Sequence, residues 1–537
     1  MVLQQQEYPW TPKPLTVLAA IIAFVLLSRS RGRRAQRLPV VNRPMTFDFF
    51  SLRPKWQFWT NCRGLIRKGL KEADVFSLIN GIGDQVVLAP KYASELATHP
   101  SLSFWAMLSE QFQSHIPGFD PFASLATWDV MNDALRRKLT KNLGTITGGL
   151  SEESALALKH EWTGNPEWHS VPLKETLGNV AARISARGLL GEELAHNKEW
   201  IRISINYTKD CFIASMLLQQ FPRFIRPLLA TVLPPCRKLR RHLAQARALI
   251  LPILQEKRCT ATEEARRTTP APNDSLVWME EVAKGRPYDP VHGQLLLSFA
   301  AINTSTDTLA QVLLDICGHD ELVKALRDEI YAVFRNHNIH SYAGSWHSVA
   351  SLAKLELMDS VLKESQRLKP VAVGESRPFY LSRLFEIYFH FCIPVQMNRI
   401  ALEDILLSDG TLLKKGTTLC VSNEKMWGAD TYPDPDTFNP YRFLRMRRQS
   451  QSPKSAELVS PSPEHMGFGF GNHACPGRFF AAAALKIALC HILLKYDVAL
   501  VTPAKPRVWE VGVSLIVSPR ACIAVRRRNK GEQEWEI

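Results

Sequence analysis

A glycine-rich loop that carries one cysteine and runs directly into a helical pattern constrains this chain more than any other stretch. The loop covers residues 468–478, Phe-Gly-Phe-Gly-Asn-His-Ala-Cys-Pro-Gly-Arg, and a helical run follows from Phe479 to Tyr496. Glycines let a backbone approach a large planar cofactor closely. A cysteine at a helix start has its thiolate favoured by the N–H groups exposed there. The pattern predicts that Cys475 is a metal-binding thiolate; the alternative is a buried thiol in a turn.

This loop resembles the haem-binding signature of the cytochrome P450 family, Phe-x-x-Gly-x-Arg-x-Cys-x-Gly. Phe468, Gly471, Cys475 and Gly477 match it, and His473 stands where the family usually has Arg. The resemblance implies a haem b cofactor held by these five residues, with Cys475 as the axial ligand of the iron. A thiolate ligand pushes electron density onto haem iron and favours O–O cleavage, which is the chemistry of oxygen insertion.

Residues 289–318 have the pattern of a long helix that carries a second family motif. Asp289 can cap its N-terminus and Pro290 suits its first turn. At about 1.5 Å per residue the helix would be roughly 42 Å long. Midway lies Ala-Ala-Ile-Asn-Thr, residues 300–304. The resemblance implies that Thr304 acts in catalysis by proton delivery, with Asn303 in place of the usual acid. The alternative is an ordinary core helix whose hydroxyls bond back to the preceding turn.

A third motif is a Glu-x-x-Arg pair near the end of another helical stripe. Glu364 and Arg367 are three residues apart, so they share a helix face and can pair. An isolated pair of this kind is usually solvated. In the P450 family, however, it forms a buried structural network with an arginine from a Pro-x-Arg-Phe segment. Arg442, within residues 438–443, supplies that arginine. Three motifs in the family's order make the resemblance specific.

Two further arginines are implied at the haem propionates. Residues 128–143 read as an amphipathic helix carrying Arg136 and Arg137. The family's helix in this region usually supplies a basic residue through Trp-x-x-x-Arg, a spacing that is absent here. Arg136 or Arg137 is therefore the candidate, and a solvated basic face is the alternative. The family also uses an arginine about ten residues beyond the Glu-x-x-Arg motif, for which Arg399 is the candidate.

Arg399 lies 32 residues after Arg367, so the spacing predicts an insert between them. Residues 376–396 are rich in aromatic side chains and have no clear periodicity. Codons for residues 374–376 can contain an intron donor, and those for residues 394–395 an acceptor. Removing the 21 codons between these sites keeps the reading frame and brings Arg399 to 11 residues after Arg367. We predict a retained intron here, with a genuine family-specific loop as the alternative.

The N-terminus predicts a single membrane anchor. An apolar run extends from Leu15 to Leu27, and five arginines follow it by residue 37. A cleaved signal peptide would instead carry its positive charge ahead of the apolar run. Positive charge on the C-terminal side keeps that side cytoplasmic. We predict a lumenal tail at 1–14, a transmembrane anchor at 15–30, a basic and proline-containing linker at 31–46, and a cytosolic catalytic domain at 47–537 on the endoplasmic reticulum membrane.

Composition restricts the partners. The ten cysteines form no C-x-x-C pair, which argues against a disulfide scaffold or structural zinc site. The formal charge of +15 suits an anionic membrane surface or an acidic protein, and no nucleic-acid motif accompanies it. No flavin or dinucleotide fingerprint is present. The resemblance therefore implies that electrons come from NADPH through a separate cytochrome P450 reductase, with cytochrome b5 as a further candidate partner.

Together these features predict a mainly α (α+β) fold of the cytochrome P450 type, with the haem between the helix around Thr304 and the helix after Cys475. Residues 259–273 are predicted to be an exposed linker, residues 445–463 a flexible insert, and residues 511–517 part of a closing hairpin. The implied function is a monooxygenase that oxidises a lipophilic terpenoid, meroterpenoid or indole diterpene, as in resembling fungal enzymes. The alternatives are a reductase-independent haem-thiolate isomerase or dehydratase and a catalytically impaired haem protein.

Overall fold

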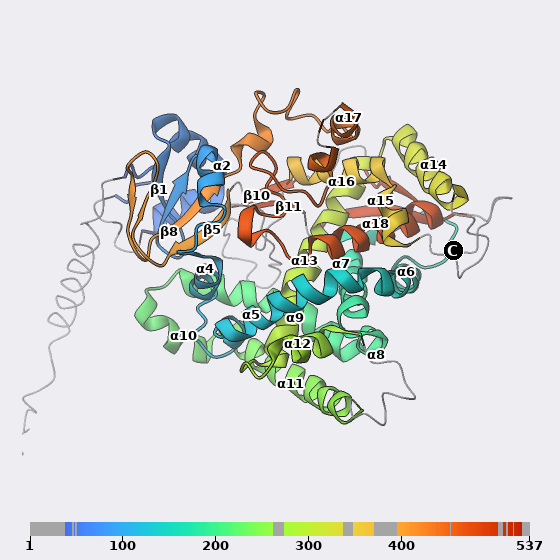
Figure 1. The fold of residues 1–537 in the computed structure, drawn as a ribbon, viewed down its shortest axis with the longest axis horizontal. Coiled ribbons are helices and arrows are strands. Elements are labelled where there is room, and N and C mark those ends of the chain that lie inside the picture. Colours follow the sequence, from blue (N-terminus) through green and yellow to red (C-terminus); the bar gives the residue numbers. More distant parts are fainter. Residues whose placement is uncertain are drawn as a thin grey trace, which may run out of the picture.

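A helical lobe and a smaller sheet lobe pack on each other in this computed structural model (Figure 1). It describes residues 38–45, 48, 51–260, 273–336, 347–369, 395–449, 451, 453–502, 508–511, 514–518 and 520–528. The tail, the anchor and most of the exposed linker predicted at 259–273 lie outside these ranges. Within them, no helix is both long enough and apolar enough to cross a membrane.

The helices run in chain order through both lobes. They are α2 Leu52–Glu72, α3 Ala93–Leu96, α4 Phe104–Gln111, α5 Leu125–Ala134, α6 Thr140–Trp162, α7 Leu173–Leu190, α8 Glu192–His196, α9 Lys198–Gln219, α10 Arg226–Val232, α11 Pro234–Thr260, α12 Ser275–Ala283, α13 Pro290–Ile316, α14 Asp320–Asn336, α15 Val349–Ala353, α16 Glu356–Leu368, α17 Arg442–Gln449 and α18 Arg478–Lys495. One π-helical turn, Leu135–Leu139, joins α5 to α6.

The strands form small sheets. They are β1 Val75–Ile79, β2 Asp84–Leu88, β3 Leu102–Ser103, β4 His169–Pro172, β5 Val395–Ala401, β6 Ile405–Leu406, β7 Leu412–Leu413, β8 Thr418–Ser422, β9 Tyr496–Leu500, β10 Val508–Val511, β11 Ser514–Val517 and β12 Cys522–Arg527. The largest sheet has the order β1-β2-β8-β5-β3, with β2 and β8 parallel and its other pairs antiparallel. The hairpin of β10 and β11 confirms the closing hairpin predicted near residues 511–517.

The long helix α13 crosses the helical lobe, and its predicted start is confirmed. Asp289 accepts hydrogen bonds from the backbone N–H groups of Val291 and His292, and Pro290 occupies the first turn. Most of its side chains are buried, because α7, α9, α16 and α18 pack around it. Because neighbours surround the helix, apolar residues recur on nearly every side of it, and its sequence pattern continues without a break.

The large sheet packs against α2 on one face and against a second hydrophobic cluster on the other. Successive side chains point to opposite faces. Phe76 and Leu78 pack under α2, whereas Val75 joins the cluster on the other face. A Cβ on Gly69 of α2 would lie 2.3 Å from the ring of Phe76, so only glycine allows this close helix-to-sheet approach.

The predicted linker at 31–46 ends earlier than expected. The backbone N–H of Ser77 donates to Pro39 O at 2.8 Å, and Val41 N–H donates to Ser77 O at 3.1 Å. The buried Asn42 amide donates to Pro54 O and Ile79 O and accepts from the Ile79 N–H. Residues 38–45 therefore belong to the sheet lobe. Hydrogen bonds to distant parts of the chain fix them, which local composition did not indicate.

The flexible insert predicted at residues 445–463 is wrong, because this segment is tied to α16. The Lys363 ammonium, 1% exposed, donates to the carbonyl oxygens of Ser455, Glu457 and Ser460 at 3.0, 2.7 and 3.1 Å. Leu458 is buried and its N–H donates to Asp359. Burial lowers the pKa of Lys363 to about 8, so the amine is still mostly protonated at neutral pH.

Replacing Lys363 by Met is expected to destabilise the protein by about 2–3 kcal/mol, because three carbonyl oxygens lose their shared donor while the side-chain volume is nearly kept. The midpoint of thermal unfolding should fall. Lys425→Met is the control, since Lys425 is partly exposed and its pair with Glu464 is worth little. Equal midpoints for the two variants would contradict the structural role of Lys363.

Candidate haem site

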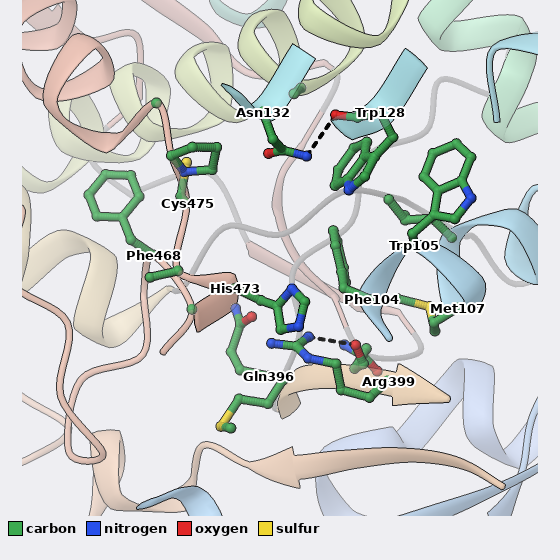
Figure 2. A pocket seen from close by; sticks show the side chains of 18 of the residues that line it. Phe104, Trp105, Met107, Trp128, Asn132, Gln396, Arg399, Phe468, His473 and Cys475 are labelled. Carbon is green, nitrogen blue, oxygen red and sulfur yellow. Dashed lines mark hydrogen bonds between the residues drawn. The ribbon is translucent and has the colours of Figure 1, made fainter. Parts of the chain in front are cut away.

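A cavity of about 1160 Å³ lies between the middle of α13, the loop before α18 and strand β5. Figure 2 labels side chains around it that come from the loop, β5, α4 and α5. Most of the lining is apolar or aromatic, including Phe104, Trp105, Met107, Leu108, Phe112, Trp128, Leu297, Ala300, Ala301, Val395, Met397, Phe468, Phe480 and Leu485. The cavity is large enough for a planar cofactor and a second molecule.

The loop at 468–478 places Cys475 at the cavity wall. Its backbone N–H donates to Phe468 O at 2.8 Å, which closes the loop ahead of α18. Gly469 and Gly471 have φ of 72° and 71°, the left-handed region that favours glycine. A Cβ on Gly471 would lie 2.0 Å from Ala97 O, whereas a Cβ on Gly477 would meet nothing within 4 Å. Gly471 therefore lets the loop approach α3, and Gly477 leaves open space beside the sulfur.

The Cys475 thiol is harder to ionise than its place at a helix start predicts. Burial raises the pKa of its thiol, and this outweighs the opposing effects of the Gly477 N–H and the Arg478 charge. The helix start alone therefore does not make it a thiolate. A metal ion would have to displace the proton, as metal binding to cysteine generally does. Cys475 and Phe468 both line the cavity, as Figure 2 shows.

The middle of α13 brings Thr304 to the same cavity as Cys475. Ala300, Ala301, Thr304 and Ser305 line it, and Asn303 is not among the lining residues. The Thr304 hydroxyl donates to Ala300 O at 2.8 Å, which is the back-bonding of an ordinary core helix. Its oxygen can still accept a hydrogen bond from the cavity. Thr304 therefore combines the back-bonded hydroxyl of a core helix with a position at the cavity, as the two interpretations of the sequence predicted separately. Asn303 has no direct contact with the cavity that would support a catalytic role.

Arg399 is a buried cation at the cavity, 4% exposed. Its Nη1 donates to the backbone oxygen of Asn398 at 2.6 Å, and its guanidinium lies over the ring of Phe104. Within the described ranges no carboxylate forms an ion pair with it. Burial lowers the pKa of Arg399 to about 10, which leaves it charged at neutral pH. A buried charge without a partner favours an anionic group from a bound molecule.

His473 lies beside Arg399 (Figure 2). Its Nε2 is 3.2 Å from Leu102 O, and since a carbonyl only accepts, Nε2 carries the proton. Burial, followed by the charges of Arg399 and Arg136, lowers the pKa of His473 to about 4. The imidazole is neutral at physiological pH, so His473 adds no positive charge where the family's arginine would.

Arg136 reaches the cavity from the π-helical turn. Its Nη2 donates to Asn472 O at 2.7 Å, and it lines the cavity, whereas the neighbouring Arg137 pairs with Asp133 on the surface. The extra residue of a π turn rotates the helix face, and such turns are frequent at functional sites. This distinguishes the two candidate arginines, a choice that the sequence left open.

Sequence reasoning missed Trp128 and Asn132, which line the cavity from α5 (Figure 2). The Asn132 amide donates to Trp128 O at 3.0 Å. The two residues have the spacing of the Trp-x-x-x-Arg motif, with Asn in place of Arg. Searching for the spacing with any polar residue at its end would have found them.

Glu364, Arg367 and Arg442 form a buried network of ion pairs. Arg367 donates to both Glu364 oxygens at 2.8 and 2.9 Å, and Arg442 Nε donates to both at 3.1 Å. Arg367 also donates to Met426 O at 2.7 Å. Glu364 and Arg367 are 0% exposed. The network joins α16 to the segment leading into α17.

The family model for cytochrome P450 matches residues 74–379 and 389–521. The chain belongs to the cytochrome P450 family. The interruption at 380–388 falls within the predicted insert. Residues 370–394 lie outside the described ranges, whereas Val395 and Gln396, the last two residues of that predicted insert, pair with Ser422 and Val421 in the large sheet. The retained intron therefore stays a prediction, which sequencing of the transcript would test.

Curated relatives are similar over nearly the whole chain. Cytochrome P450 monooxygenase adrA of Penicillium rubens is 41% identical over 525 residues, covering 96% of this chain and 97% of the relative. Monooxygenase trt6 of Aspergillus terreus is 42% identical, covering 89% and 92%. Monooxygenase ausR of Penicillium brasilianum is 37% identical, covering 97% and 96%. This P450 is thus a monooxygenase, an oxidoreductase with haem-thiolate iron that receives electrons from NADPH through a reductase, as is standard for the family.

The residues at the cavity fit this cofactor. The Cys475 sulfur is a soft donor for iron, and Gly477 leaves space beside it. Arg399 and Arg136 supply positive charge for two carboxylates, and the neutral His473 lines the same cavity. The sulfur donor, the space beside it and the two positive charges are thus all supplied by residues of this chain.

Proposed function

We propose that this P450 oxidises a lipophilic terpenoid, meroterpenoid or indole diterpene. The observation that carries this proposal is that Cys475 and Thr304 border one cavity, whose remaining wall is mainly apolar and aromatic. When bound there, haem iron supplies the activation of O2. The described side chains exclude water, orient an apolar substrate and hold a hydroxyl beside it. The aromatic cluster of Phe112, Phe122, Phe212 and Phe299 stiffens the wall, with ring centroids 4.4–5.3 Å apart.

We assign Cys475 as the iron ligand and Arg399 with Arg136 as the cations for the haem propionates. Phe468, Gly471, Gly477 and His473 shape the loop. Glu364, Arg367 and Arg442 have a structural role, because their ion pairs join α16 to the start of α17. Glu364 also accepts from the N–H of Asn439, which fixes the segment that leads into α17.

Incubating microsomes that contain the enzyme and its reductase with NADPH, isotopically heavy O2 and candidate substrates tests the function. We expect NADPH-dependent product that carries one heavy oxygen atom. Conversion without NADPH would support the isomerase or dehydratase alternative instead. Metabolite profiling of a deletion strain would supply the natural substrate for this assay.

Thr304→Ala is expected to uncouple NADPH consumption from product. The variant should keep its haem, but product per NADPH should fall several-fold and peroxide should rise, since positioned proton donors commonly contribute large rate factors. Thr306→Ala is the matched control: its hydroxyl bonds back to Ile302 O in the same way, yet it does not line the cavity. Unchanged coupling in Thr304→Ala, or equal loss in both variants, would remove Thr304 from proton delivery.

We further propose that the catalytic domain lies on the cytosolic face of the endoplasmic reticulum membrane, anchored by residues 15–30. One edge of the domain supports this placement with exposed apolar side chains: Leu52, Trp56, Phe221, Phe224, Leu228 and Val232. Lys55 donates to Gln219 O, which joins the start of α2 to the end of α9, and Arg223 donates to Ile82 O, which joins the segment before α10 to the turn between β1 and β2. Exposed apolar patches of this kind mark contact surfaces.

Protease added to intact microsomes is expected to digest the catalytic domain, because the arginines after residue 27 keep that side cytosolic. An antibody against the C-terminus would follow the loss by immunoblotting, and a lumenal protein would serve as the control. Protection of the domain until detergent is added would show the opposite topology. The net charge of +15 also favours an acidic reductase, or cytochrome b5, on the same face.

A further inference from the structure

Three side-chain amides form a chain of hydrogen bonds along one wall of the cavity. Asn80 Nδ2 donates to Gln85 Oε1 at 2.8 Å, and Gln85 Nε2 donates to Asn398 Oδ1 at 2.9 Å. The three residues lie after β1, on β2 and on β5, and all line the cavity. Asn80 and Gln85 are each 6% exposed, so the chain is largely shielded from water.

The backbone sets the direction of this amide chain. Asn80 Oδ1 accepts from the N–H groups of Ile82 and Gly83 at 2.9 and 3.1 Å, and an N–H can only donate. The Asn80 nitrogen must therefore face Gln85. Each amide then presents its oxygen to the previous nitrogen, and the series ends with Asn398 Nδ2. The assignment of oxygen and nitrogen at Asn398 thus follows from the turn at residues 80–83, which connects β1 to β2.

The local backbone of β5 exposes that terminal amide. The pairing of β5 with β8 shifts register between Gln396 and Arg399, and Met397 within this bulge has φ of 54°. Bulges re-aim side chains and occur next to active sites. Among the described residues, none accepts a hydrogen bond from Asn398 Nδ2, although Asn398 lines the cavity beside Gln396 and Arg399 (Figure 2 shows the latter two).

We propose that Asn398 is a specificity-determining residue whose Nδ2 donates to a neutral oxygen of the substrate, such as a ketone, lactone or ester carbonyl. Asn80 and Gln85 are positioning residues that hold this donor toward the cavity. The amide chain has no formal charge, so it would not offset the desolvation of a carboxylate in an apolar wall. This inference rests on the proposed function, because it describes how the same cavity orients its substrate.

Imidazoles with alkyl tails that differ only in their terminal group test the inference with the haem-loaded enzyme. The imidazole nitrogen coordinates the iron, and the alkyl tail, in a series of increasing length, ends in a methyl ketone, a secondary alcohol or a plain alkyl group. Optical titration gives the affinity of each without requiring turnover. At the tail length that reaches Asn398, the wild type is expected to bind the ketone roughly three- to tenfold more tightly than the alkane. Asn398→Leu, of similar volume, should lose this preference while binding the alkane unchanged.

A substitution at Gln85 tests whether the amide chain orients Asn398, and it distinguishes this effect from a structural defect of the cavity. In Gln85→Glu, at mildly alkaline pH, the carboxylate can only accept, so Asn398 must turn its nitrogen toward residue 85 and its oxygen toward the cavity. The preference should then switch from the ketone to the alcohol, which can donate. A structural defect would weaken all three compounds together.

The outcomes distinguish this inference from the function on which it rests. Equal ketone and alkane affinities in the wild type at every tail length, or an unchanged ketone preference in Asn398→Leu, would overturn the role of Asn398. An unchanged ketone preference in Gln85→Glu would overturn the positioning role of the amide chain. If no imidazole shifts the haem spectrum, the haem site itself is wrong and the proposed function fails with it.

Discussion

Cys475→Ala protein is expected to lose the thiolate-ligated Soret band of its reduced carbon monoxide complex completely, and with it all NADPH-dependent product. Cys475 is the cysteine of the glycine loop, and its sulfur borders the cavity opposite α13. Alanine offers no donor for iron. Neither the neutral His473 nor a backbone oxygen of the loop would restore a thiolate spectrum. Haem content should fall as well, because the bond from iron to sulfur contributes to retention of the group.

Cys490→Ala is the matched control for this experiment. Cys490 lies on α18, the helix that follows the loop, and is fully buried, so its loss removes packing without removing the donor. Burial also raises the pKa of Cys490, which keeps it a thiol. The control should keep the thiolate band with at most a modest loss of thermal stability. A thiolate band that survives in Cys475→Ala but disappears in Cys490→Ala would reassign the ligand.

The parts of the fold that sequence reasoning predicted are those whose cause is local. The start of α13 depends on Asp289 and Pro290, which act within the first turn of their own helix. The helix after the cysteine loop was expected at 479–496 and is found at Arg478–Lys495. Cap residues and apolar periodicity act over a few positions, so a single sequence displays them directly.

The parts of the fold that sequence reasoning missed depend on contacts with residues far away in the chain. Residues 445–463 look flexible by composition, yet Lys363 of α16 donates to three of their carbonyl groups. The π turn at 135–139, which brings Arg136 to the cavity, has no composition of its own. Burial reverses the expected pKa shift of Cys475. In each case the deciding interaction comes from tertiary packing, and no local pattern records it.

The residues of the candidate site likewise divide into those that local motifs reveal and those that depend on tertiary contacts. Family motifs in the sequence led to Thr304, Cys475 and the Glu364 network, because each has a fixed spacing. Asn398 was overlooked beside Arg399, since the role proposed for its amide depends on Asn80 and Gln85, more than 300 residues earlier in the chain. Hydrogen-bond direction along such a chain can be read only when all of its members are placed.

Glu364→Ala is expected to destabilise the protein by about 3–5 kcal/mol, since removing one partner of a buried charge network leaves the others uncompensated. Arg367 and Arg442 would remain buried with no carboxylate between them, and the Asn439 N–H would lose its acceptor. Because domains are only marginally stable, such a loss should leave little soluble, haem-containing protein. Haem content per polypeptide and the thermal midpoint measure it.

Glu356→Ala supplies the comparison that identifies burial as the cause. Glu356 lies on the same helix, but its side chain is 40% exposed and its nearest pairing, with Arg447, is long at 3.6 Å. Exposed pairs contribute at most about 1 kcal/mol, so this variant should retain its haem and unfold near the wild-type temperature. Should Glu364→Ala behave like Glu356→Ala, the buried network would be dispensable for both stability and haem retention.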